Sequence, residues 1–231
     1  ELMWGATITN RMKEAIQIVH KIRRTSHSYK RKAQMIRVAV LPKALYGAEA
    51  APVCESTLQE LRRVIANTIA PSARIKSLAM VFTTSSHGSD LDPEVVLYTR
   101  KNTMLRRMMA KHPGTGDIAK EIIGSYHLNG HVGTTYDEST LKTLKPAPPP
   151  GDVTRKRWKG KCKPRGVMGL LLIATNMIGA AMSSELHIHQ HHEAPLDIYN
   201  VPWQHLGPML EEKAVQARIY EATQQRTLLK G

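Results

Sequence analysis

Aromatic side chains are scarce in this sequence. They make up 5% of its 231 residues, and only one of them is phenylalanine. A core must therefore be built mostly from Ile, Leu, Val, Ala and the eleven Met residues, and the 42% of apolar residues suffice to bury one. Because few large rings are available, we predict helices rather than a β-sandwich, and the expected fold class is mainly α.

Cysteine is almost absent as well. Cys54 and Cys162 are the only two and lie 108 positions apart, which is too few for a disulfide framework and the wrong spacing for a zinc module. This usage indicates a reducing compartment, so we expect an intracellular protein, nuclear or cytoplasmic. The sequence does not open on Met, and Leu2–Thr9 is typical of a strand; we therefore expect a piece of a longer protein.

A long apolar run is also missing. The run Val167–Met182 has 16 residues and includes Thr175, Asn176 and two glycines, so it is too short and too polar for a usual membrane span. We predict a buried helix there and expect no membrane partner.

Acidic side chains are outnumbered by basic ones. The chain holds 33 Lys and Arg against 19 Asp and Glu, a net charge of +14. Most of the excess lies in residues 1–112, which carry 19 basic and 8 acidic groups. An excess of this size repels itself unless a polyanion shares the surface, so nucleic acid is the expected partner.

The block between Glu14 and Glu49 contains eight basic side chains and no acid. Such a stretch can follow a phosphate backbone through charge-assisted hydrogen bonds and counterion release. A merely solvated helix face is the alternative, but such faces ordinarily mix both signs. The candidate nucleic-acid-binding residues here are Lys21, Arg23, Arg24, Lys30, Arg31, Lys32, Arg37 and Lys43.

A second basic tract extends from Arg155 to Arg165, again without an acid. Its sequence is broken by Trp158 and bounded by Pro and Gly, so a basic arm with one stacking aromatic would suit single-stranded nucleic acid. A localisation signal or a plain linker remains an alternative, because short basic runs are common. The candidate binding residues are Arg155, Lys156, Arg157 and Trp158.

Catalytic and metal-ligating patterns are not found. A polymerase needs paired carboxylates to hold two metal ions, whereas Asp90 and Asp92 stand just before Pro93 and are typical of a helix start. The histidines between His187 and His192 do not have the spacing of a zinc signature. We predict no catalytic residue and no metal site in this chain.

The apolar spacing predicts a series of helices after the opening strand. The first covers residues 10–24 with Thr9 or Asn10 as its cap, and a second ends at Leu41 before Pro42. A short helix is expected at 43–51, followed by one that begins at Ser56, has Gln59 in a capping box and stops at Pro71. Further helices are expected at 93–111, at 117–123 and from about Pro202 to the end. Composition divides the chain into a basic helical domain at 1–112, a Gly/Pro-rich and basic linker at 113–166, and a less ordered helical region at 167–231.

Two stretches resemble reverse transcriptases of retrotransposons without long terminal repeats. Leu2–Thr9 resembles the strand and turn that follow the catalytic palm, although Trp4 stands where Leu is usual. Val40–Glu49 looks like the region after it, in which a helix ends at Leu-Pro and a Tyr-Gly-hydrophobic-Glu step follows. The resemblance extends through Leu58, Leu61, Arg62 and Ile65 and weakens towards residue 112.

This resemblance implies a helical thumb that holds an RNA/DNA hybrid or RNA. The family's catalytic aspartates lie upstream, so the chain would lack polymerase activity, Mg²⁺ would be expected only in the missing palm, and that palm would be a partner. Two alternatives stay open: a stand-alone, noncatalytic RNA-binding or ribonucleoprotein component, and a decayed copy of an element that no longer folds into a functional unit.

Overall fold

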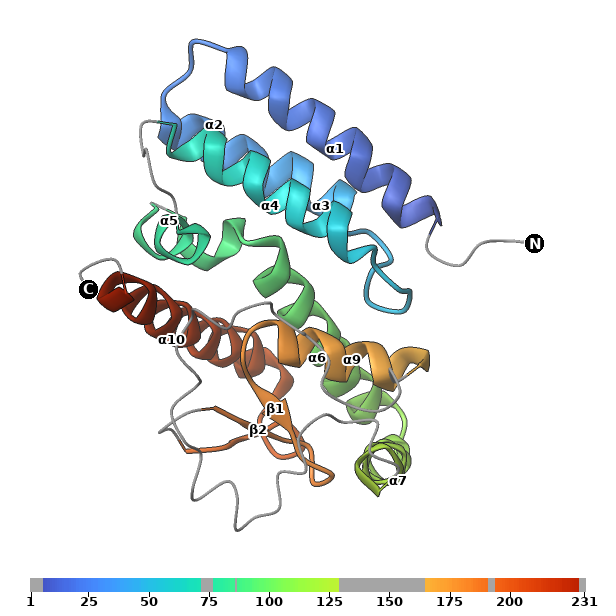
Figure 1. The fold of residues 1–231 in the computed structure, drawn as a ribbon. Coiled ribbons are helices and arrows are strands. Elements are labelled where there is room, and N and C mark those ends of the chain that lie inside the picture. The colour runs from blue at the N-terminus through green and yellow to red at the C-terminus, as the bar shows by residue number, and fades with distance from the viewer. Residues whose placement is uncertain (1–5, 72–76, 86, 129–164, 191–193, 229–231) are drawn as a thin grey trace. The chain divides into compact units, whose positions relative to one another are not determined.

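The computed structural model describes residues 6–71, 77–85, 87–128, 165–190 and 194–228 (Figure 1). These residues are mainly helical, which confirms the predicted fold class. They form two compact units: Glu1–Leu97 with Ala214–Thr223, and Tyr98–Lys213 with the residues from Gln224 onward. The three-part division predicted from composition stays a prediction.

The first unit is built on a helical hairpin. Helix α1 (Ala6–Arg24) turns back into α2 (Tyr29–Met35), which continues through the π-helical turn η1 (Ile36–Val40) into α3 (Leu41–Ala44) (Figure 1). Helix α4 (Glu55–Ile69) packs against α1 and α2. Buried side chains at helical spacing, among them Met12, Val19, Ile36, Leu61 and Ile65, form the core between them.

Smaller elements complete this unit. Helix α5 (Leu78–Thr84) and the 3₁₀ turn η2 (Gly88–Leu91) lead into α6 (Pro93–Lys111). The segment Ala214–Thr223 of the long terminal helix α10 (Trp203–Leu228) also belongs to this unit. The predictions of a helix over 93–111 and of a terminal helix starting near Pro202 are therefore confirmed.

The predicted opening strand is wrong wherever the structure describes it. Residues from Ala6 onward are helical, so Thr9 and Asn10 lie inside α1 instead of capping it. Ile8 is buried and extends the apolar stripe of Met12 and Ala15. Packing of this face outweighs the β-propensity of the Thr and Ile residues. Residues 2–5 lie outside the described ranges.

Pro42 does not end the second helix, contrary to prediction. The helical path continues to Ala44 because the π-helical turn precedes the proline: the Leu41 N–H bonds to the Ile36 carbonyl, five residues back. This wider turn changes the carbonyl positions with which a proline ring would otherwise collide. The helix predicted over 43–51 is correspondingly short, and residues 45–50 form turns that include Gly47 at a φ of +79°.

The start of α4 also differs from prediction. Cys54 precedes the first helical residue, Glu55, so Ser56 lies within the first turn, and Gln59 donates to the Glu94 carboxylate instead of closing a capping box. The end is as predicted, since the helix stops at Ile69, two residues before Pro71.

The second unit combines helices with a small sheet. The later part of α6 is joined by α7 (Thr115–Leu128), longer than the helix predicted at 117–123, and by α9 (Gly166–Met177). Strands β1 (Ala181–Met182), β2 (His187–His189) and β3 (Leu196–Asp197) are antiparallel in that order.

The apolar run from Val167 is thus only partly the single buried helix that was predicted. Its helix ends at Met177, Gly179 adopts a φ of +82°, and the run finishes in β1. Gly179 suits this turn because it lacks a Cβ. Of the helices in the described ranges, none combines the length and the apolar character needed to cross a bilayer.

Candidate nucleic-acid interface

The connection between α1 and α2 is a fixed turn. At its start, the Thr25 hydroxyl donates to the Ile22 carbonyl at 2.7 Å. At its end, the Ser28 hydroxyl caps α2 by accepting from the Arg31 N–H at 3.3 Å. Helix α1 ends here because its apolar stripe stops at Ile22 and polar residues follow.

Lys32 ties the two arms of this turn together. Its side chain is buried, and its ammonium group donates to the Arg23 carbonyl at 2.9 Å, in the last turn of α1. A cation placed at the C-terminal end of a helix also interacts favourably with the helix dipole. The ammonium group lies 5.7 Å from the ring centre of the exposed Tyr29. The structure therefore gives Lys32 a clear role in shaping the hairpin.

Five of the eight basic residues named from the sequence gather at this end of the hairpin. All five side chains are exposed. Those of the last turn of α1 and those of the first turn of α2 are separated by only four loop residues. We call this group the hairpin cluster, and its members are Lys21, Arg23, Arg24, Lys30 and Arg31.

In the described residues, no carboxylate forms an ion pair with the side chains of the hairpin cluster. Arg31 donates to the Gln34 amide oxygen at 2.9 Å, which leaves its charge intact. For the other four members, no ion pair or hydrogen bond of the side chain occurs within the described part of the chain. Like charges held this close repel one another, so an anion bound across them is favoured.

The remaining two basic residues of the block are paired with acids. Arg37 on η1 lies 2.7 Å from the Asp90 carboxylate, and Lys43 on α3 lies 3.2 Å from that of Glu14. All four side chains are at least partly exposed, so each pair contributes at most about 1 kcal/mol. Their charge is partly offset, and a phosphate contact by either residue would compete with its carboxylate.

The structure does not describe the candidate binding residues of the second basic tract. Arg155, Lys156, Arg157 and Trp158 lie outside the described residues, so their predicted binding role stays a prediction.

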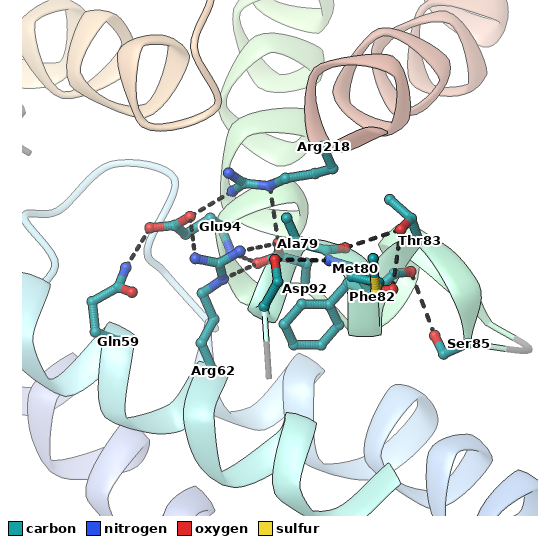
Figure 2. Close-up of polar contacts among 11 residues, drawn as sticks. Gln59, Arg62, Ala79, Met80, Phe82, Thr83, Ser85, Asp92, Glu94 and Arg218 are labelled. Atoms are coloured by element: carbon teal, nitrogen blue, oxygen red, sulfur yellow. Dashed lines mark hydrogen bonds and ion pairs between the residues drawn. The ribbon is translucent and has the colours of Figure 1, made fainter. Parts of the chain in front are cut away.

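A buried charge network, which the sequence did not reveal, supports α4 and the start of α6. Arg62 makes a bidentate contact with Asp92, with both N–O distances at 2.7 Å, and lies 2.9 Å from Glu94 (Figure 2). Arg218 reaches the same carboxylates at 3.2 and 2.5 Å. Gln59 completes the group by donating to Glu94.

All four charged side chains of the network are at most 3% exposed. Burial by itself would raise the pKa of Asp92, but the guanidinium groups of Arg62 and Arg218 outweigh burial and lower it. Asp92 also accepts from the Glu94 N–H at 3.0 Å, which confirms the predicted helix cap. Two positive and two negative charges balance, so the network serves to fix the fold.

Nothing in the described residues forms a metal centre. No three His, Cys, Asp or Glu side chains are grouped there so as to hold an ion. On β2, the rings of His187 and His189 are 6.2 Å apart, and His187 Nε2 lies 3.7 Å from Asp197. His191 and His192 lie outside the described residues.

Comparison with known proteins gives no relative: no protein-family model, no curated protein and no solved structure matches this chain. The likeness to reverse transcriptases therefore still depends on the two sequence stretches described above.

Proposed function

We propose that this chain binds nucleic acid through the hairpin cluster. The observation that carries the proposal is the exposure of five basic side chains on either side of the turn between α1 and α2. The sequence has no acidic residue between Glu14 and Glu49. Contacts of this kind go to phosphate oxygens, so they position a duplex without reading its sequence.

The hydrogen bonds that shape the turn strengthen this proposal. The Lys32 contact with the Arg23 carbonyl and the Ser28 cap hold both arms in place before any partner binds. A preformed site loses less conformational entropy on binding than one that must first become ordered. The hairpin cluster is therefore suited to bind a regular phosphate backbone.

In the fuller form of the proposal, the chain is the thumb and downstream part of a retroelement reverse transcriptase. The thumb would hold an RNA/DNA template-primer hybrid while an upstream palm, with its aspartates and Mg²⁺, carries out synthesis. The chain alone would then bind but not polymerise, in a nuclear or cytoplasmic setting. The sequence resemblance at Val40–Glu49 supports this form.

Salt-dependent titration with a labelled RNA/DNA hybrid tests the proposal. The variant Lys21→Gln/Arg24→Gln/Lys30→Gln removes three charges from the hairpin cluster. The control variant Lys13→Gln/Arg63→Gln/Lys111→Gln removes three exposed charges elsewhere in the chain, none of them among the candidate binding residues. If each cluster residue contacts one phosphate, the first variant lowers the slope of log K against log salt by about 2 to 3, because each contact contributes about 0.7–0.9.

The control variant has the same net charge, so it separates a local contact from a general loss of positive charge. Equal weakening by both variants would refute the hairpin cluster as the interface. Single-stranded RNA that binds as tightly as the hybrid and is weakened as much by the hairpin-cluster variant would instead favour the stand-alone RNA-binding component over the template-primer thumb.

A further inference from the structure

In the second unit, residues 198–202 link β3 to α10, and this link is hydrogen-bonded to α6. The Arg106 Nε–H donates to the Val201 carbonyl at 2.7 Å. The guanidinium carbon of the neighbouring Arg107 lies 5.3 Å from the ring centre of Trp203. Two successive arginines of α6 thus contact the backbone of the link and Trp203, the first residue of α10.

Tyr199, at the other end of the link, lies against α7. Its ring passes so close to Gly116 that a Cβ there would overlap with Cε2 and lie 3.0 Å from Cδ2. The Lys120 ammonium group lies 4.6 Å from the centre of the same ring. Any larger side chain at position 116 would therefore force the tyrosine ring to move.

Both rings nevertheless remain accessible. Trp203 is 42% exposed and Tyr199 is 40% exposed, although each already has a cation over its ring. Contacts with α6 and α7 thus position both rings at the surface. We call Tyr199, Trp203, Arg106, Arg107 and Lys120 the ring patch.

The charge of the ring patch is positive but weaker than that of the hairpin cluster. Glu185 lies 3.4 Å from Lys120 and partly offsets it, and Asp117 and Glu121 are exposed on the same helix, α7. Electrostatic attraction alone would therefore bind a phosphate backbone only weakly. The distinguishing feature is two exposed rings interleaved with cations, which is the arrangement that stacks unpaired bases.

We infer that the ring patch binds single-stranded nucleic acid by stacking bases on Trp203 and Tyr199. This inference deepens the proposed function and rests on it for the identity of the partner, but it uses other residues and another physical interaction. A duplex keeps its bases stacked within itself, so the ring patch would select unpaired strand while the hairpin cluster holds paired strand.

The test is a titration of the full chain with a labelled 20-nucleotide oligouridylate and, in parallel, with the RNA/DNA hybrid. Replacing Trp203 with Ala or Leu should weaken oligouridylate binding about 5- to 150-fold, the range for losing one stacked base. Trp203→Phe keeps a ring and should retain most of the affinity. Ile118→Ala, at an exposed position of α7 two residues from Gly116, should have no effect.

The outcomes separate the two claims. Unchanged oligouridylate binding in Trp203→Leu, with helical content preserved, would overturn the ring patch and leave the hairpin cluster standing. Loss of oligouridylate binding with hybrid binding intact supports the ring patch. A wild-type chain that binds the hybrid but not oligouridylate also overturns the ring patch, and one that binds neither overturns both proposals.

Discussion

Arg62 is the side chain whose removal should damage the first unit most. It is 1% exposed and contacts both buried carboxylates of the network. In Arg62→Met the apolar volume is largely kept, but Asp92 and Glu94 then share Arg218 alone. Removing one partner of a buried ion pair costs about 3–5 kcal/mol. For a chain of this length, this corresponds to a fall in Tm of about 6–20 °C.

The assay is urea and thermal unfolding followed by circular dichroism. Arg63→Met is the matched control, because it makes the same change at the next position of α4, where the side chain is exposed. It should change the free energy of unfolding by less than about 0.5 kcal/mol. Equal destabilisation by the two variants would refute the assigned role of the network.

A double-mutant cycle tests the charge argument itself. Adding Glu94→Gln to Arg62→Met leaves Asp92 and Arg218 as a balanced pair. The double variant should therefore be more stable than the sum of the two single effects predicts, by about 0.5–3 kcal/mol. Simple additivity would mean that packing, and not charge balance, explains the cost.

Four further variants test single positions. The folded-state pKa of Asp92 lies below its ordinary value of 3.8. The stability that its charge contributes is therefore fully present above about pH 5 and is lost as the pH falls through the folded pKa. The difference in free energy of unfolding between the wild type and Asp92→Asn, measured by urea unfolding, should shrink on acidification. Lys32→Met should lower stability by about 1–3 kcal/mol, because the hydrogen bond to the end of α1 is lost. Gly124→Ala meets ordinary contacts and should raise the melting temperature slightly, whereas Gly116→Ala must displace Tyr199 and should alter its aromatic NMR signals.

Local signals in the sequence were enough to predict part of the fold. Asp92 and Pro93 are a strong helix start, and the structure has the expected cap and first turn there. The apolar spacing also predicted most of α1. At Ile8, however, the β-branched composition indicated a strand, and only the contacts of the folded unit decide in favour of a helix.

The missed features depend on long-range contacts. Arg62 and Arg63 are adjacent and look alike in sequence, yet one is buried against carboxylates 30 and 32 positions later and the other is exposed. Likewise, nothing local shows that Lys32 differs from Lys30. Of the predicted binding block, the sequence could therefore indicate the charge but not which side chains are engaged in the fold.

The central claim is that the hairpin cluster contacts nucleic acid, and ultraviolet cross-linking of the chain to the RNA/DNA hybrid tests it most directly. Cleavage after Glu releases residues 15–49 as one peptide, because Glu49 at its end is the first acidic residue after Glu14. If the hairpin cluster contacts the hybrid, adducts form in this peptide and are located by tandem mass spectrometry within residues 21–31. Adducts confined to other peptides, with residues 15–49 recovered unmodified, would contradict it.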